Sequence, residues 1–213
     1  ILRYSALMKA QLYLLTPPRI DDAFPALLES VLDAGPVAAL QIRLKEHSEA
    51  EVRSYLPRLI EIARARGVAA IVNDSPDLAR EFGADGVHVG LSDTPYAEAR
   101  ATMGKEAIVG VTCHNSRDLA MNAGEKGADY VAFGAFYPTQ TKQPKATAPI
   151  EILEWWSEIF EIPCVAIGGI TPDNARPLIE AGADYIAVSS GIWAYPDGPQ
   201  AGVEAFSQLL ASS

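Results

Sequence analysis

The chain has 213 residues, of which 49% are hydrophobic, so it can bury the core of a single domain. Its 27 acidic residues outnumber its 17 lysines and arginines and give a net charge of −10. This charge argues against a surface for nucleic acid or for an anionic membrane. A local cluster of cations can still bind phosphate, and Arg43, Lys45 and Lys142 are the candidates for it.

The cysteines and the first residues of the chain indicate a compartment. Cys113 and Cys164 lie in apolar segments without metal-ligand spacing, which predicts reduced thiols in a cytoplasmic protein. The sequence has no apolar run long enough to cross a bilayer, and its start is too short and irregular for a secretory signal. Met8 is a candidate natural start, with the residues before it upstream of the natural protein or foreign to it. We expect residues 1–9 to be a leader that is disordered or foreign to the natural protein.

A repeated unit organises the chain. Gly-Ala-Asp occurs at residues 83–85, 127–129 and 182–184, and each time a short apolar run follows. Glycine is a usual residue just after a helix, and an apolar run suits a strand that is buried on both faces. The same pattern predicts strands at residues 12–16, 38–43, 69–73, 86–89, 107–111, 130–134, 164–168 and 185–189. It predicts helices at residues 22–34, 48–65, 76–82, 95–103, 116–125, 149–160, 172–181 and 200–210.

Eight alternating strands and helices fit a closed parallel barrel, so we predict a single (β/α)₈ TIM-barrel domain over residues 1–213. The competing architecture is an open, doubly wound sheet. No Gly-x-Gly-x-x-Gly follows the first strand, which disfavours a dinucleotide-binding version of that sheet. Pro57 falls inside the second helix and should kink it or shift its start.

The sixth strand leads into a segment suited to a polyanion. Thr139, Thr141 and Lys142 supply two hydroxyl donors and an ammonium group. Asp74 and Asp93 follow earlier strands, and carboxylates beside such a loop would repel phosphate unless a cation lay between them. Mg²⁺ takes one or two carboxylates together with substrate phosphate oxygens, so these residues predict a magnesium–diphosphate site. The alternative is that the two aspartates cap the helices that open near Pro76 and Pro95.

Other strand ends also carry polar groups. Alternation points Gln41, Arg43 and Lys45 to one side, either into a site or as a solvated strand end. The loops after strands seven and eight usually hold phosphate in a barrel. In this chain those loops contain Gly168, Gly169, Ser189 and Ser190.

The three histidines are assigned different places. We expect His88, inside a strand, to be a hydrogen-bonded core residue or a ligand contact. His114 follows the fifth strand near the mouth of the barrel, where it would contact a ligand. His47 is expected to be exposed.

Several motifs together resemble the thiamine phosphate synthase family, in order and in spacing, over residues 12–192. They are Gln41-x-Arg43-x-Lys45, Asn73-Asp74, Gly86-Val87-His88-Val89-Gly90 with Asp93, Gly110-Val111-Thr112-x-His114, Pro138-Thr139-x-Thr141-Lys142 and Ile167-Gly168-Gly169-Ile170. Enzymes of that family couple hydroxymethylpyrimidine diphosphate to a thiazole phosphate and release thiamine monophosphate and pyrophosphate.

The resemblance implies a role for each matching residue. Asp74 and Asp93 would hold Mg²⁺, Gln41 and Thr112 would face the pyrimidine, and Lys142, Arg43 and Lys45 would be catalytic. The groups around the diphosphate would be Arg43, Lys45, Asn73, Thr139, Thr141 and Lys142. Those that hold the thiazole phosphate would be the backbone of Gly168, Gly169, Ser189 and Ser190. The partners would be these two small molecules, with neither nucleic acid nor membrane, and a homo-oligomer stays open.

The chain departs from the family pattern at four positions. The family usually has an acidic residue at Leu44, glutamine at Leu91, serine at Thr112 and proline at Ala135. One alternative is the related thiazole tautomerase, which needs neither metal nor diphosphate, and the retained aspartates and threonine–lysine loop argue against it. A second alternative is a non-catalytic protein that binds thiamine precursors. Turnover in the presence of Mg²⁺ would exclude this alternative.

Overall fold

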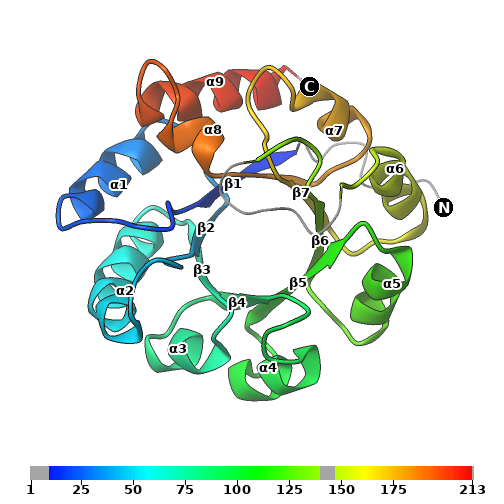
Figure 1. The fold of residues 1–213 in the computed structure, drawn as a ribbon, viewed down its shortest axis with the longest axis horizontal. Coiled ribbons are helices and arrows are strands. Elements are labelled where there is room, and N and C mark those ends of the chain that lie inside the picture. The colour runs from blue at the N-terminus through cyan, green and yellow to red at the C-terminus, as the bar shows by residue number, and fades with distance from the viewer. Residues whose placement is uncertain (1–9, 140–146, 213) are drawn as a thin grey trace.

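The computed structural model describes residues 10–139 and 147–212. Their eight strands are all parallel and form a closed barrel in sequence order, with β8 paired to β1 (Figure 1). The strands are β1 Gln11–Leu15, β2 Ala39–Ile42, β3 Ala69–Asn73, β4 Gly86–Val89, β5 Ile108–His114, β6 Tyr130–Gly134, β7 Cys164–Ile167 and β8 Tyr185–Val188. The predicted barrel is confirmed, and the open sheet is excluded.

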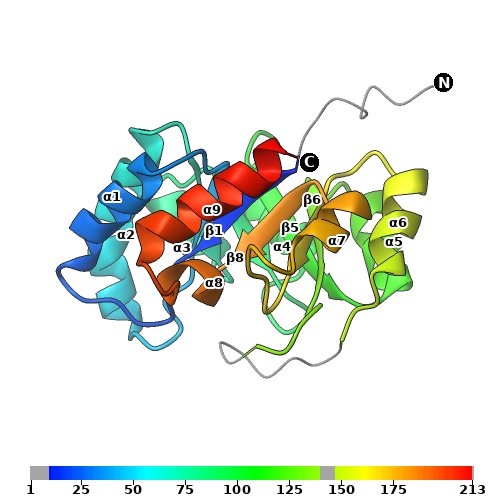
Figure 2. The same ribbon diagram turned by 90° about the horizontal axis from the view of Figure 1, so that it is seen from above.

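Helices surround the strands and flank them on both sides in the perpendicular view (Figure 2). They are α1 Phe24–Asp33, α2 Glu49–Arg64, α3 Pro76–Glu81, α4 Tyr96–Met103, α5 Arg117–Glu125, α6 Glu151–Ile159, α7 Arg176–Glu180, α8 Ser190–Trp193 and α9 Pro199–Ala211. Three details differ from the prediction, the first being that α7 begins four residues later than expected. The short helix α8 directly follows β8, and β5 extends through a register irregularity to His114. Residues 1–9, the predicted leader, lie outside the described part of the chain.

Local sequence signals explain where helices begin. Ser48 caps α2 in a reciprocal arrangement with Glu51, and Ser75 and Ser116 accept backbone N–H bonds at the starts of α3 and α5. Pro57 lies inside α2, yet the helix still begins directly after Ser48, so the predicted shift of its start is wrong. The cap at Ser48 satisfies the first turn, and Pro57 removes only one later N–H donor.

The Gly-Ala-Asp repeat has a structural explanation. Its glycines adopt positive φ angles of 66°, 91° and 95° after α3, α5 and α7. The aspartate at each repeat, Asp85, Asp129 or Asp184, accepts a hydrogen bond of 2.7–2.8 Å from a backbone N–H of the preceding strand. The repeat therefore ends a helix and fixes the next strand against its neighbour at the amino end of the barrel.

Two apolar clusters follow from the alternation of side chains along the strands. The larger cluster lies between the strands and the helices and contains Trp156, Phe206 and Leu28, all of them fully buried. The smaller one fills the barrel interior and contains Tyr13, Leu15, Ile71, Val165 and Ala187, among others. The interior cluster fills the space between the strands, so the inside of the barrel is a packed core and not a channel.

Cys113 is fully buried and unpaired, and burial raises the pKa of its thiol to about 12. Cys164 is also buried, and its Sγ donates to the Gly182 carbonyl at 3.5 Å. Among the helices of the described residues, none combines the length and the apolar character that crossing a bilayer requires.

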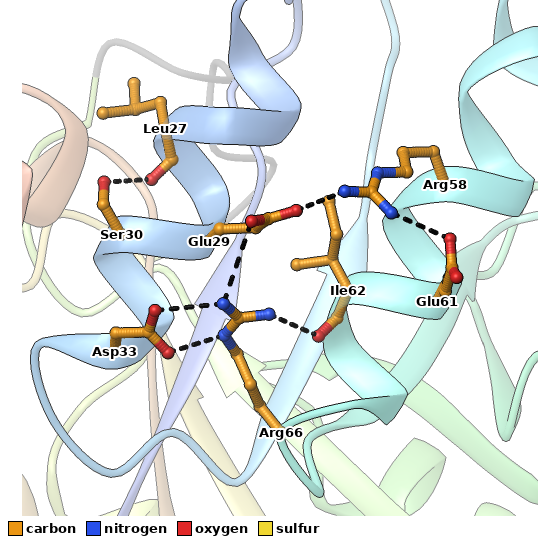
Figure 3. A network of polar contacts seen from close by, with 8 residues as sticks. All are labelled: Leu27, Glu29, Ser30, Asp33, Arg58, Glu61, Ile62 and Arg66. Carbon is orange, nitrogen blue, oxygen red and sulfur yellow. Dashed lines mark hydrogen bonds and ion pairs between the residues drawn. The ribbon is translucent and has the colours of Figure 1, made fainter.

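A network of ion pairs joins α1 to the end of α2 (Figure 3). Arg66 donates to both carboxylate oxygens of Asp33, at 2.7 and 3.0 Å, and its guanidinium also lies 4.0 Å from Glu29. Arg58 bonds to Glu29 and to Glu61. Arg66 thus holds two neighbouring helices of the outer layer together.

We expect Arg66→Met to lower the Tm by about 2 °C, because methionine keeps the aliphatic stem and removes the forked ion pair. The difference should shrink in 1 M NaCl, since the partner carboxylates are solvent-accessible. Arg66 lowers the pKa of Asp33 by hydrogen bonding, so the stabilisation exists at neutral pH and disappears as the pH falls through that lowered pKa. Thermal melts at pH 7 and in acid, with and without salt, test this, and equal melts at pH 7 would contradict it.

Candidate active site

One pocket opens at the carboxyl ends of the strands, where barrel enzymes place their chemistry. All thirteen predicted site residues that the structure describes line this pocket: Gln41, Arg43, Lys45, Asn73, Asp74, Asp93, Thr112, His114, Thr139, Gly168, Gly169, Ser189 and Ser190. Thr141 and Lys142 lie outside the described residues. The strand ends thus bring together groups that are up to 149 positions apart in the sequence, from Gln41 to Ser190.

The two aspartates face the pocket and do not cap helices. Asp74 has a φ of 66°, in the left-handed region, and its backbone N–H donates to the His88 carbonyl at 2.8 Å. Ser75, the next residue, caps α3 instead. Asp93 accepts a 2.8 Å bond from the Gly90 N–H, and α4 begins without a side-chain cap. The capping alternative is therefore wrong for both residues.

The charges around Asp74 fit a cation. Burial raises the pKa of Asp74, the hydrogen-bonded Lys45 ammonium lowers it, and the neighbouring Asp93 carboxylate raises it further. Two carboxylates this close repel each other, and a divalent cation between them would remove that repulsion. The described residues contain no cluster of three or more ligating His, Cys, Asp or Glu side chains. Two carboxylates that face a pocket suit a hard cation that takes its remaining ligands from water or from phosphate, as Mg²⁺ does.

Strand β2 and the residues that follow it supply a row of polar side chains. Gln41 is only 4% exposed and donates a 2.6 Å hydrogen bond from Nε2 to Asn73 Oδ1. Arg43 is half-buried, and burial lowers its pKa while the Asp74 carboxylate opposes that shift. Lys45 lies farther out, with 46% of its side chain exposed. The inward alternation is confirmed, and the solvated alternative describes only the outermost of the three residues.

The floor of the pocket is a chain of buried polar groups. The Tyr13 and Tyr130 hydroxyls are 2.8 Å apart, Tyr130 Oη is 2.8 Å from His88 Nδ1, and His88 Nε2 is 2.7 Å from Thr112 Oγ1. Burial raises the pKa values of both tyrosines, so they remain neutral donors and acceptors. The buried, hydrogen-bonded place predicted for His88 is confirmed. The sequence motifs do not single out the two tyrosines, although alternation along β1 and β6 places them in the interior.

Gly110 makes this chain of hydrogen bonds possible. It pairs with Tyr130 in the β5–β6 ladder, and a Cβ atom at Gly110 would lie 1.9 Å from the Tyr130 ring. The missing side chain lets the tyrosine ring cross β5 and reach His88 on β4. A glycine in a strand thus marks a close approach of two neighbours.

The turn after β7 brings backbone close to the end of β6. Gly169 has a φ of 65°, and a Cβ atom there would lie 2.4 Å from the Pro138 carbonyl oxygen. Asn174 fixes the turn by donating to the Gly169 carbonyl at 3.0 Å and accepting from the Thr171 N–H at 2.8 Å. The double glycine therefore allows two strand-end loops to touch at the rim of the pocket.

We expect Gly169→Ala to reduce activity strongly, because it combines an unfavourable φ with a clash against backbone that cannot rotate away. Gly104→Ala is the matched control, since Gly104 also has a positive φ but nothing lies within 4 Å of its Cβ position. Initial rates and thermal melts are measured for both variants. Both carry the backbone strain of a positive φ, and only Gly169→Ala adds the clash with the Pro138 carbonyl. Equal activities would show that the close approach at Gly169 does not matter.

The departures from the family pattern fall in different places. Leu44 is 6% exposed and belongs to the core between strands and helices, so it does not face the pocket. Leu91 lines the pocket with 53% of its surface exposed. Thr112 and Ala135 also line it. At Leu91 the pocket rim near Asp93 therefore carries an apolar side chain in place of the family's glutamine. The charged residues Arg43, Lys45, Asp74 and Asp93 still line the pocket.

The prediction for His47 is wrong. Its side chain is only 2% exposed, its ring packs edge-on against Tyr55, and its Nε2 accepts a 2.9 Å bond from the Ile20 N–H. Its position in a polar segment suggested exposure, whereas in the fold the β1–α1 loop at Ile20 and Tyr55 of α2 lie against its ring.

The fold and the pocket are those of an α/β-barrel enzyme. Its strand ends bring together cationic side chains, a pair of carboxylates and a turn with two glycines. The family model for thiamine monophosphate synthase matches residues 12–192. The chain belongs to this family, and it is a transferase.

Relatives and solved structures agree with this assignment. Thiamine-phosphate synthase of Rhodospirillum centenum is 56% identical, over 94% of this chain and 97% of that protein. Its counterpart in Hyphomonas neptunium is 50% identical, over 96% and 95%. The solved thiamine phosphate pyrophosphorylase of Pyrococcus furiosus superposes with a TM-score of 0.83 at 30% identity, covering 96% of this chain and 97% of that one.

Proposed function

We propose that this enzyme joins 4-amino-2-methyl-5-hydroxymethylpyrimidine diphosphate to a thiazole phosphate and releases thiamine monophosphate and pyrophosphate. The observation that carries the proposal is the presence of two phosphate-compatible regions in one pocket. Arg43, Lys45 and the carboxylate pair lie on the β2–β4 side, and the turns at Gly168 and Ser189 lie on the β7–β8 side. Two phosphorylated substrates would then meet over the barrel floor.

The reaction needs a leaving diphosphate rather than a protein nucleophile. The bond between the pyrimidine methylene carbon and the diphosphate oxygen breaks, and the oxygen keeps the electron pair. The electron-rich aminopyrimidine stabilises the methylene cation, and the thiazole nitrogen then forms the new carbon–nitrogen bond. The Arg43 guanidinium and the Lys45 ammonium meet the charge that develops on the diphosphate.

Mg²⁺ fits the carboxylates of Asp74 and Asp93, and when bound it would neutralise part of the diphosphate charge. Thr139, on the loop after β6, lines the same pocket and would donate to the diphosphate, and Thr141 and Lys142 would do so on sequence grounds alone. Asn73, at the end of β3 and bonded to Gln41, would face the diphosphate from the side of Arg43 and Lys45.

The pyrimidine would lie over the polar floor. Because Gln41 uses its Nε2 for Asn73, its Oε1 is oriented to accept from an exocyclic amine. Thr112, held by His88, would face the same ring. His114 has a φ of 53° at the bulge of β5 and would contact the ligand at the rim.

A coupled assay tests the proposed function. Pyrophosphate release is measured with both substrates, with each one alone, and with and without Mg²⁺. Release only in the complete mixture supports the proposal. A thiazole tautomerase would turn over a thiazole carboxylate phosphate without diphosphate or metal, and a binding protein would release nothing.

A further inference from the structure

His47 has a buried polar side chain to which the proposed reaction gives no role. It follows Arg43 and Lys45 in the segment that leaves β2, directly before the capping residue Ser48. Its ring contacts the β1–α1 loop at Ile20 and also packs against Tyr55 of α2, with ring centroids 5.5 Å apart. A side chain that is 98% buried and polar has a defined hydrogen-bonding task or costs stability.

The bond from Ile20 defines the protonation of the ring. The Ile20 N–H donates to Nε2, so this nitrogen carries no proton and the ring is in its Nδ1–H form. Nδ1 is buried, has no hydrogen-bond partner among the described residues, and lies 3.6 Å from Glu51 Oε1. The ring thus acts as an acceptor toward the β1–α1 loop, with a carboxylate on its other side.

This bond is the last of a series that joins residues 16–20 to residues 41–47. The Thr16 N–H donates to the Gln41 carbonyl at 3.0 Å, and the Arg43 N–H donates to Thr16 Oγ1 at 2.8 Å. Farther along, the Glu46 N–H donates to the Pro18 carbonyl at 3.0 Å. The Ile20–His47 bond ends the series, so the segment carrying Arg43 and Lys45 is held at both ends.

We propose that His47 is a positioning residue that holds the segment of Arg43 and Lys45 in place for the diphosphate. The inference rests on the proposed function for the identity of that ligand. His47 itself does not line the pocket. Its contribution is to keep two long cationic side chains near one geometry, which matters because small displacements of binding groups reduce rates strongly.

Three substitutions of His47 distinguish the effect of its hydrogen-bond acceptor from the effect of the space that its ring fills. His47→Gln can place Oε1 near the position of Nε2 and keep the bond from Ile20. His47→Leu fills similar space without an acceptor, and His47→Asn is polar but too short to reach the Ile20 N–H. Each variant is characterised by its Tm, by calorimetric binding of inorganic pyrophosphate with Mg²⁺, and by KM and kcat for each substrate.

We expect His47→Leu and His47→Asn to weaken pyrophosphate binding and to lower kcat/KM for the pyrimidine diphosphate by about tenfold, the usual scale for losing one buried hydrogen bond. His47→Gln should stay within about twofold of the parent, and KM for the thiazole phosphate should not change. The pyrophosphate measurement does not need turnover. If the parent protein binds pyrophosphate but forms no product, the proposed function fails while the role of His47 is still judged from binding.

Three results would overturn the positioning role. The first is a lower Tm in the leucine and asparagine variants with unchanged pyrophosphate binding, which would make His47 purely structural. The second is a glutamine variant as impaired as the leucine variant. The third is an equal loss toward both substrates.

Discussion

Replacement of Asp93 by asparagine is expected to lower Mg²⁺-dependent turnover by up to about 100-fold while the protein stays folded. Asparagine can still accept the bond from the Gly90 N–H through its side-chain oxygen, so the loop should keep its shape. What disappears is one of two negative charges that face the pocket. Asp74→Asn should act in the same direction and also leaves Lys45 without its ionic partner.

Asp85→Asn is the matched control for this charge change. Asp85 also accepts a backbone N–H bond, from Ala70, but it lies at the opposite end of the barrel. Product formation is measured over a range of Mg²⁺ concentrations, with circular dichroism melts to check folding. Near-normal turnover of Asp93→Asn at limiting Mg²⁺ would contradict the assignment of a cation to this pair.

The second large effect is expected at Arg43. Arg43→Ala should reduce kcat/KM for the pyrimidine diphosphate by about 10²–10³-fold, because a half-buried guanidinium that meets developing charge is lost. Arg43→Lys should recover only part of this, since an ammonium group cannot form the forked pair of bonds to phosphate oxygens. KM for the thiazole phosphate should stay nearly constant.

Arg53→Ala serves as the control for Arg43, since it removes an exposed guanidinium from α2 that pairs with Glu49 and Glu81. It should leave both kinetic constants unchanged. Steady-state kinetics with each substrate varied in turn distinguish the cases. If Arg43→Ala raised both KM values equally, Arg43 would support the fold of the pocket rather than the diphosphate.

The barrel could be predicted because its signals are local. The Gly-Ala-Asp repeat marks helix ends and strand starts, and two-residue alternation points Gln41, Arg43 and Lys45 inward. In a closed parallel barrel all strand ends meet at one rim, so residues at successive strand ends share a pocket whatever their distance in sequence. This is why the predicted residues that the structure describes were found together.

Local sequence signals are sufficient to predict the (β/α)₈ architecture, the end of the barrel at which the pocket opens and the charged residues that line it. Tertiary structure alone decided what depends on contacts between distant segments. His47 is buried because the loop at Ile20 covers it, and the Tyr130 ring reaches His88 because Gly110 leaves room on the intervening strand. Asp74 faces the pocket because a left-handed turn leaves Ser75 to cap the helix. The physical reason is that propensity and periodicity describe one segment at a time, whereas burial and hydrogen-bond partners are set where two segments meet.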